Sequence, residues 1–295
     1  MPRRSTWRVL VTGAGGLLGR ALMQRLAAEA NVTPLALTRR DADFSHAGVL
    51  REALLQRRPD VVINAAAFTA VDAAEQPQHH GSVLRINAEA VREAALACEA
   101  CGARLLQVST DYVFDGASQR EPYSEDATPR PLNWYGISKL AGEHAASAYA
   151  PRSLVVRTGG LFSPESQRNF VARMLRRAGE RHPLHVVDDQ TVAPTYAPHL
   201  ADAVWRLLCA APEISGTVHL TAQGATTWYR FACALFTAAG LAHVEVHPTS
   251  SAAYASPAKR PPYSLLANET LARLGLDPLP DWQTGLRDHL AAMGR

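Results

Sequence analysis

The feature that most restricts the fold is an apolar segment that runs directly into a glycine-rich turn and then into a helical pattern. Residues Trp7–Thr12 are largely apolar, as in a buried strand, and leucines recur at i, i+4 and i+8 from Leu18, as on one face of a helix. Gly13, Gly16 and Gly19 give this turn a Gly-x-x-Gly-x-x-Gly spacing. This order predicts a dinucleotide site, because glycines let the backbone approach a pyrophosphate at the helix N-terminus. The spacing is also compatible with a turn that binds nothing.

Strand-like and helix-like segments alternate through the first half of the chain. The expected strands lie at residues 34–38, 60–64, 104–108 and 153–157, and the expected helices at 48–57 and 84–101. Apolar strands that alternate with helices predict a parallel sheet covered on both faces. Beyond residue 158 prolines interrupt the alternation, and a helix at about 199–210 with a strand at 217–220 returns to the sheet.

We therefore predict an α/β fold, a Rossmann-type doubly wound parallel sheet with a smaller, irregular C-terminal substrate-binding lobe. The NADP(H)-binding Rossmann domain is expected to comprise residues 1–160 plus about 190–223, and the substrate-binding lobe about 161–189 and 224–295. Ligands of such sheets bind beyond the carboxyl ends of the strands. Thr110, which follows one predicted strand, is therefore expected to line that crevice.

The end of the second predicted strand indicates which dinucleotide is bound. An acidic residue there usually binds the ribose 2′-hydroxyl of NAD, whereas Arg accommodates the 2′-phosphate of NADP. Here the strand ends in Thr38 and Arg39, with no carboxylate before Asp41, which favours NADPH, with NADH as an option. Arg39 is also compatible with a solvated loop charge. We further expect the Asp43 carboxylate to accept from the adenine amino group and the Phe44 ring to lie against the adenine face.

Tyr135 and Lys139 form a Tyr-x-x-x-Lys pair in a chain that has only two lysines and 28 arginines. A lysine in such a chain indicates a role that a guanidinium cannot perform, since Lys titrates and donates as a compact point charge. Four residues is about one helical turn, so both side chains would project from one helix face. There an ammonium would lower the pKa of the phenol, ordinarily about 10, and make it an acid near neutral pH. The spacing also arises by chance on solvated helices.

Composition and charge exclude several classes of protein. The chain has 295 residues, of which 47% are hydrophobic and 19% charged, as in a folded globular protein. No apolar run reaches the length of a membrane span, so we do not expect a membrane protein. The arginines are scattered and form no nucleic-acid module, so we do not expect a nucleic-acid partner. A first strand at Trp7 leaves no room for a signal peptide, and we expect a cytoplasmic protein. Cys98 and Cys101 lack a second Cys/His pair, so zinc is not predicted.

Several longer motifs are typical of one family. They are Arg-Pro-Asp-Val-Val-Ile-Asn-Ala-Ala-Ala-Phe-Thr-Ala-Val-Asp at 58–72, Ser-Thr-Asp-Tyr-Val-Phe at 109–114, Tyr-Gly-Ile-Ser-Lys-Leu-Ala-Gly-Glu at 135–143 and Leu-Pro-Asp-Trp-Gln at 279–283. With these motifs the chain resembles the extended short-chain dehydrogenase/reductases and, within them, the dTDP-4-dehydrorhamnose reductase family, over nearly its whole length. The resemblance implies NADPH-dependent reduction of the C4 keto group of a nucleotide-diphospho-4-keto-6-deoxysugar, with dTDP-4-dehydro-L-rhamnose as the leading candidate.

The resemblance also implies roles for individual residues. Tyr135 would protonate the sugar C4 oxygen as hydride arrives from the nicotinamide, Lys139 would bind the nicotinamide ribose and tune the tyrosine, and Thr110 would hold the reacting carbonyl. The residues expected beside the cofactor are Gly13, Gly16, Leu17, Leu18, Gly19, Ala65, Ala66, Ala67 and Thr69. Those expected to contact the sugar or its diphosphate are Thr110, Asp111, Asn169, Gln190 and Arg260.

Two departures from the family pattern bear on the sugar and on assembly. Members often carry a Trp against the bound sugar, in the segment where this chain has Gly160, with Phe162 two residues further on. Some members join subunits through a metal held partly by a Glu of the first helix. Here Arg20 follows Gly19, so no metal is predicted, and a homodimer is still an option.

Two alternative functions stay open. The first is an epimerase or dehydratase of the same superfamily, which also uses Tyr and Lys. A dehydratase generally has an acidic pair beside the Thr, whereas Asp111 has no carboxylate neighbour in the sequence. The second is a non-catalytic NADP-binding regulatory subunit resembling the methionine adenosyltransferase β subunit, which would keep the fold while serving a partner enzyme.

Overall fold

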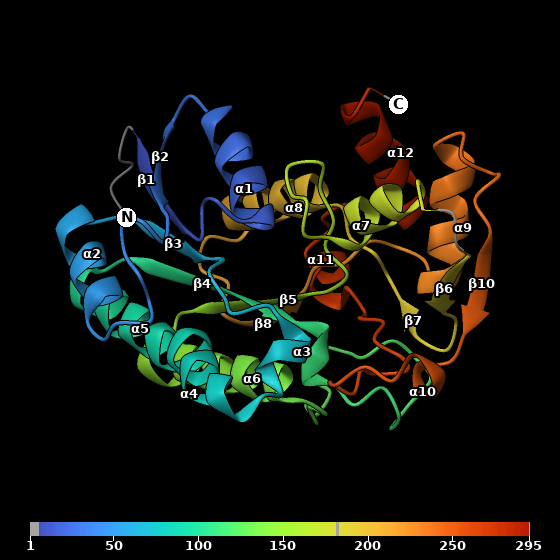
Figure 1. Cartoon of the computed structure of the whole chain (residues 1–295). Coiled ribbons are helices and arrows are strands. Elements are labelled where there is room, and N and C mark those ends of the chain that lie inside the picture. Colours follow the sequence, from blue (N-terminus) through green and yellow to red (C-terminus); the bar gives the residue numbers. More distant parts are fainter. Residues whose placement is uncertain (1–5, 181–182, 295) are drawn as a thin grey trace.

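Six strands form one parallel sheet at the centre of the protein (Figure 1). The computed structural model describes residues 6–180 and 183–294. The strand order is β2-β1-β3-β4-β5-β8, and every neighbouring pair is parallel. The strands are β1 (Trp7–Thr12), β2 (Val32–Leu37), β3 (Val61–Asn64), β4 (Arg104–Thr110), β5 (Leu154–Thr158) and β8 (Gly216–His219). The predicted α/β fold with a parallel sheet is confirmed, and the strand ends differ from the prediction by one or two residues.

Helices cover both faces of the sheet (Figure 1). One face carries α1 (Leu17–Ala27) and α8 (Ala197–Ala210), which bury one apolar core against the strands. The other face carries α2 (Val49–Arg57), α5 (Ala90–Cys101) and α6 (Trp134–Tyr149) over a second core. Burial on both faces explains why the strands read as continuous apolar runs.

The single helix predicted at 84–101 is wrong in one respect. The structure has α4 (Pro77–Leu84), then a π-helical turn at Arg85–Glu89, and only then α5. At this turn α6 approaches closely, since a Cβ at Gly142 would collide with the backbone carbonyl oxygen of Asn87. Such π turns are rare and are frequently found at functional sites.

The strand order reverses between β1 and β3, and the carboxyl ends of the strands meet there. Ligands of open α/β sheets bind at this point. Three buried polar side chains cross it: Thr12 Oγ1 donates to Asn64 Oδ1 at 2.5 Å, and Asn64 Nδ2 donates to Gln107 Oε1 at 2.7 Å. They satisfy one another's hydrogen bonds inside an otherwise apolar sheet, as buried polar groups must.

A smaller lobe follows β5, shown mainly in orange and red in Figure 1. It contains two small sheets, one of β6 (Leu184–Val187) with β10 (Val246–Thr249) and one of β7 (Thr191–Val192) with β9 (Thr226–Thr227). Its core gathers Phe162, Phe231 and Trp282. The remaining helices of the described chain are α3 (Val71–Ala74), a 3₁₀ turn at Asp111–Val113, α7 (Phe170–Arg177), α9 (Trp228–Ala238), α10 (Ser251–Tyr254), α11 (Glu269–Arg273) and α12 (Trp282–Ala292). No helix within residues 6–180 and 183–294 is long and apolar enough to cross a membrane.

Candidate active site

The glycine turn is sterically obligatory and leaves the start of α1 open. Gly13 has a φ of +63°, and a Cβ there would lie 2.9 Å from the backbone of Ala66. A Cβ at Gly19 would collide with the carbonyl oxygen of Gly13. Helix α1 begins after Gly16 without a side-chain cap. The arrangement fits a pyrophosphate, because a side chain would fill the space and the helix N-terminus attracts an anion. The Leu18 side chain belongs to the core, so only its backbone is suited to ligand contact.

The segment after β3 lies against this turn. Residues 65–67 are partly exposed, Thr69 is exposed, and the amide of Ala66 donates to Thr12 Oγ1 at 3.2 Å. The buried side chain of Asn87 holds the same segment, since it accepts from the Phe68 amide at 2.8 Å and donates to Ser138 Oγ at 2.9 Å. Asn87 thus joins the predicted cofactor loop to α6. The sequence analysis missed it, and its only signal was an Asn inside an Ala-rich helical run.

The end of β2 carries the predicted NADPH determinants together with a carboxylate. Thr38 donates to Asp41 Oδ2 through both its amide, at 2.8 Å, and its hydroxyl, at 2.7 Å. These hydrogen bonds lower the pKa of Asp41, which keeps it ionised. Arg39 is largely exposed, and its Nε lies 3.5 Å from Asp43 Oδ1. The end of β2 therefore carries a positive charge, Arg39, close to a negative charge, Asp41.

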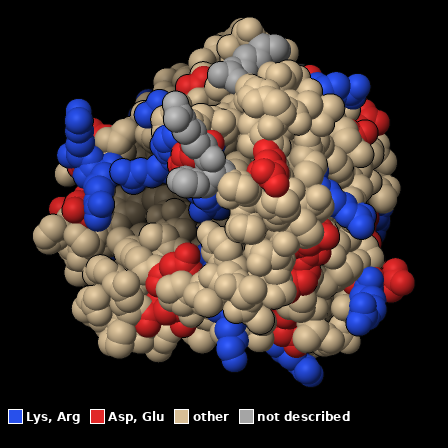
Figure 2. All heavy atoms as spheres, turned by 45° about the vertical axis from the view of Figure 1, so that its right-hand side comes forward, with Lys and Arg blue, Asp and Glu red and all other residues tan. Residues whose placement is uncertain are grey.

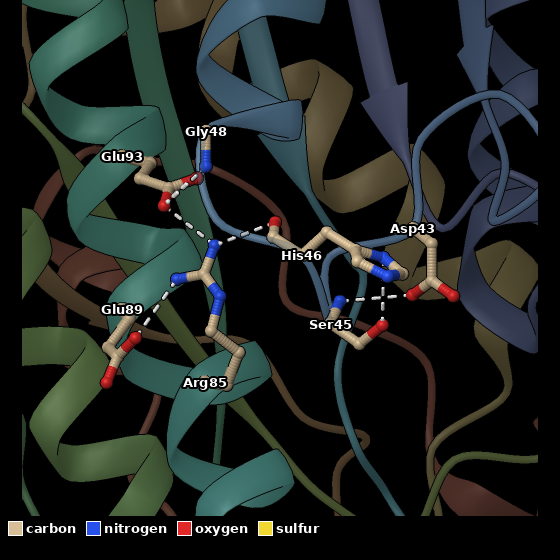
Figure 3. A network of polar contacts seen from close by, with 7 residues as sticks. All are labelled: Asp43, Ser45, His46, Gly48, Arg85, Glu89 and Glu93. Atoms are coloured by element: carbon tan, nitrogen blue, oxygen red, sulfur yellow. Dashed lines mark hydrogen bonds and ion pairs between the residues drawn. The ribbon is translucent and has the colours of Figure 1, made fainter.

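The loop after β2 is held by the π-helical turn (Figure 3). Arg85 donates to the carbonyl of His46 at 3.1 Å and to Glu93 Oε1 at 2.7 Å, and Glu93 Oε1 also accepts from the amide of Gly48 at 3.0 Å. Asp43 stays partly exposed, with Oδ1 accepting from the amide of Ser45 at 3.0 Å.

Phe44 is less available than expected. Its ring is 8% exposed and packs in the core beneath α2 and α5. Little of the ring surface is therefore left for an adenine, and its role there stays a prediction, as does that of Asp43.

The predicted catalytic residues converge at the carboxyl end of β4. Thr110 is the last residue of the strand, and its hydroxyl is hydrogen-bonded to the phenol of Tyr135. Tyr135 stands in the first turn of α6, which is capped by Asn133, whose Oδ1 accepts from the amide of Gly136 at 2.8 Å. A Cβ at Gly136 would collide with the carbonyl oxygen of Tyr112, so a glycine is required to bring this helix end against the strand end.

Lys139 lies one turn further along α6 and is 4% exposed. Its Nζ donates to the carbonyl oxygen of Val108 at 2.6 Å. Burial lowers the pKa of Lys139 to about 8, against the opposing charge of Glu143. Burial likewise raises the pKa of Tyr135 to about 12, although the hydrogen bond between its hydroxyl and Thr110 has the opposite effect. The expected lowering of the phenol pKa by the ammonium is not found, because Lys139 is directed at the strand carbonyl.

Asp111 packs closely against the backbone at Gly159, next to Gly160. Burial raises the pKa of Asp111 to about 6, against hydrogen bonds from Ser264 and Thr110. A Cβ at Gly159 would lie 2.5 Å from the Asp111 carboxyl carbon. Gly160 has a φ of +61°, and a Cβ there would lie 3.0 Å from Pro194. The backbone therefore explains why no aromatic residue stands at this position.

Phe162 does not replace the missing aromatic residue. It is 1% exposed and packs against Tyr196 and Phe231 in the core of the smaller lobe.

Arg260, for which contact with the substrate diphosphate is predicted, lies beside this cluster. It is hydrogen-bonded to the hydroxyl of Tyr112, whose ring packs edge-on against Tyr135 with centroids 5.9 Å apart. It also forms an ion pair with Asp72 at 2.8 Å. Neither Asp72 nor Tyr112 was singled out from the sequence, since both stand inside longer motifs without a distinctive pattern.

The other two predicted substrate residues hold the backbone of the smaller lobe. Asn169 caps α7 and donates from Nδ2 to the carbonyls of Ser163 and Ser166, at 2.8 and 2.7 Å. Gln190 donates to Ser251 Oγ at 2.8 Å. Their contact with a sugar stays a prediction.

The molecular surface is hollowed on the side shown in Figure 2. Lys and Arg side chains gather at the upper left rim of the hollow, and Asp and Glu side chains lie along its lower edge. Clefts with charged rims raise the local concentration of an oppositely charged ligand, so the basic rim suits an anionic one.

A hydrogen-bonded Tyr and Thr at the carboxyl edge of a sheet that also carries a dinucleotide turn define the class of the protein as a Rossmann-type NAD(P)H-dependent oxidoreductase. The family is equally clear. The chain belongs to the dTDP-4-dehydrorhamnose reductase family, since the family model described as RmlD substrate binding domain matches residues 7–295.

Individual relatives agree with this assignment. A dTDP-4-dehydrorhamnose reductase of Streptomyces griseus is 41% identical over 97% of this chain and 94% of its own length. A probable dTDP-4,6-dihydroxy-2-methyloxan-3-one 4-ketoreductase of Streptomyces antibioticus is 38% identical over 95% of this chain and 94% of its own length. The crystal structure of a dTDP-4-dehydrorhamnose reductase from Bacillus anthracis in complex with NADP superposes with a TM-score of 0.90 at 33% identity, covering 97% of this chain and 99% of that chain. The resemblance inferred from the motifs is confirmed.

Proposed function

We propose that this protein uses NADPH to reduce the C4 keto group of dTDP-4-dehydro-L-rhamnose, giving dTDP-L-rhamnose. The observation that carries the proposal is the Tyr135 phenol, hydrogen-bonded to Thr110 at the carboxyl end of β4. Arg260 is hydrogen-bonded to Tyr112, whose ring packs against Tyr135, and it provides a cation for the diphosphate of the substrate. The reductase named in Streptomyces griseus supports this choice of sugar.

The side chains supply binding and proton transfer. Thr110 holds the C4 oxygen of the sugar next to Tyr135, and the Tyr135 hydroxyl gives its proton to that oxygen, leaving a phenolate that solvent protonates again. The bound dinucleotide supplies the hydride that C4 receives. An ammonium has three N–H donors, and one of those of Lys139 is used on Val108. The other two serve the nicotinamide ribose and the phenolate.

The cofactor and the sugar would occupy opposite parts of the site. The backbone of Gly16 and Leu17 would bind the pyrophosphate, residues 65–69 would lie along the nicotinamide half, and Arg39 would take the 2′-phosphate. We assign this binding to residues 1–160 and about 190–223. Residues 161–189 and 224–295 would bind the sugar nucleotide, with a further contact from Asp111.

The test follows NADPH absorbance after dTDP-4-dehydro-L-rhamnose is added to the purified protein. Tyr135→Phe should lower kcat by about 10³-fold while NADPH binding is kept, because only the acid is lost. Tyr149→Phe, an exposed tyrosine on the same helix, is the matched control and should behave as wild type. Unchanged turnover in Tyr135→Phe would exclude the acid role.

The same assay separates the other functions. The Streptomyces antibioticus relative favours one second candidate, a ketoreductase of another dTDP-keto sugar, which would show oxidation only with that sugar. Tightly bound NAD that is never released would indicate an epimerase. NADPH binding without oxidation of any keto sugar would indicate a regulatory subunit. A homodimer and a cytoplasmic location stay predictions.

A further inference from the structure

The carboxylate of Asp72 fixes both Arg260 and the backbone that carries it. Asp72 Oδ2 accepts from Arg260 Nη2 at 2.8 Å, and Asp72 Oδ1 accepts from the amide of Ala258 at 3.3 Å. Arg260 Nη1 in turn donates to the carbonyl of Ala258 at 3.2 Å. One carboxylate therefore ties α3, which follows the predicted cofactor segment, to a residue 188 positions later in the chain.

The surroundings of this pair are basic. Burial raises the pKa of Asp72, but the hydrogen bond and charge of Arg260, the Ala258 amide and the charge of Arg173 outweigh it, so the pKa is lowered. Arg173 comes from α7 of the smaller lobe. Two arginines from different segments thus lie near one carboxylate, which is ionised at neutral pH.

Stability alone is a poor explanation for this pair. The side chain of Asp72 is 47% exposed and that of Arg260 is 21% exposed. Exposed ion pairs contribute little to the free energy of unfolding. The pair instead restricts the rotamers of the Arg260 side chain. An unpaired Arg samples many rotamers and must lose that freedom when it binds a ligand.

The remaining donors of Arg260 suit a phosphate. A guanidinium has five N–H donors, and three of those of Arg260 are used on Asp72, Ala258 and Tyr112. The Arg260 guanidinium is hydrogen-bonded to Tyr112, and the ring of Tyr112 packs against Tyr135. An anion bound by the remaining donors would sit beside the acid of the reaction.

We propose that Asp72 is a positioning residue that holds the Arg260 guanidinium ready for the diphosphate of the sugar nucleotide. The inference rests on the proposed function and names how its substrate is recognised. The alternative is that Asp72 competes with the diphosphate for Arg260. In that case, removing the Asp72 carboxylate would strengthen diphosphate binding.

The test measures binding of dTDP and of thymidine to the NADPH-loaded full-length protein by calorimetry. Asp72→Asn should weaken dTDP binding about tenfold, within the range for coupled neighbours, and leave thymidine binding unchanged. Asp202→Asn is the matched control, since Asp202 is 44% exposed and accepts from Arg25 at 2.8 Å. That variant should bind dTDP as wild type does.

A double-mutant cycle separates positioning from a general structural effect. In an Arg260→Ala background, Asp72→Asn should have no further effect on dTDP binding. An equal effect in both backgrounds, tighter dTDP binding in Asp72→Asn, or no dTDP binding by the wild type would overturn the proposal. If the wild type binds dTDP and shows the cycle but does not reduce the keto sugar, the proposed function fails and the positioning role stands. If the wild type reduces the sugar and Asp72→Asn binds dTDP normally, the proposed function stands and the positioning role fails.

Discussion

Arg157 of β5 and Glu143 of α6 form a buried bidentate ion pair. Arg157 Nη2 lies 2.7 Å from Glu143 Oε2 and Arg157 Nε lies 3.0 Å from Oε1, and both side chains are 5% exposed. Ser109 adds a hydrogen bond of 2.5 Å to the same carboxylate. Glu143 stands one turn after Lys139, and its charge raises the lysine pKa against the effect of burial. Burial and the charge of Glu143 therefore act on the protonation of Lys139 in opposite directions.

The first prediction concerns pH. The pKa of Lys139 is lowered to about 8, so its ammonium is present below that pH and is lost as the pH rises through it. Because the mechanism uses the ammonium, kcat/KM should fall with an apparent pKa near 8, well below the Tyr135 pKa of about 12. The measurement is kcat/KM between pH 6.5 and 10.

Lys139→Arg is the control for this assignment. A guanidinium stays charged throughout the range, so the variant should be slower but should lack the fall near pH 8. A fall near pH 8 that persists in Lys139→Arg would mean that another group titrates.

The second prediction concerns the glycine turn. Gly19→Ala should lower the free energy of unfolding by about 3 kcal/mol and abolish NADPH binding, because its Cβ would collide with the Gly13 carbonyl and nothing there can move aside. Gly15→Ala is the matched control in the same turn, since no atom lies within 4 Å of its added Cβ. Urea unfolding and NADPH fluorescence measure the two effects. Equal behaviour of the two variants would contradict the close approach.

The third prediction concerns the choice of cofactor. Asp41→Asn removes the carboxylate held by Thr38 and should raise the ratio of kcat/KM for NADPH over NADH about fivefold, the upper end for an exposed charge pair. Arg39→Ala should lower the same ratio by a similar factor, because a cation near the 2′-phosphate is lost. Steady-state kinetics with both cofactors measure the ratio. A shift in the same direction in both variants would show that the end of β2 does not discriminate by charge.

The strands and the class of the fold could be predicted because burial on both faces gives continuous apolar runs, as in Val61–Asn64. The break in the helix at Arg85–Glu89 could not, since its sequence, Arg-Ile-Asn-Ala-Glu, contains no Gly or Pro to interrupt a helix. The turn contacts α6 at Gly142, which comes much later in the chain. Local periodicity carries no information on such contacts.

The site shows the same division. Thr110, Tyr135 and Lys139 were predicted from motifs and strand ends, and the structure brings Thr110 and Tyr135 into contact. The residues that hold the surrounding segments were not predicted, because Asn87 bonds to Ser138 and Asp72 bonds to Arg260 across large separations in sequence. Their geometry depends on the packing of α3 and the π-helical turn against α6 and the smaller lobe.

The all-parallel sheet also has a consequence for how the chain folds. A parallel pair needs a crossover between its strands, so no two neighbours of this sheet can form a hairpin. The edge of β5 stays unpaired until β8, ending at His219, has been synthesised and docked. Contacts this far apart in sequence fold slowly, and an unpaired strand edge invites association between chains. A newly made chain therefore passes through an aggregation-exposed stage that lasts until about three quarters of it have emerged.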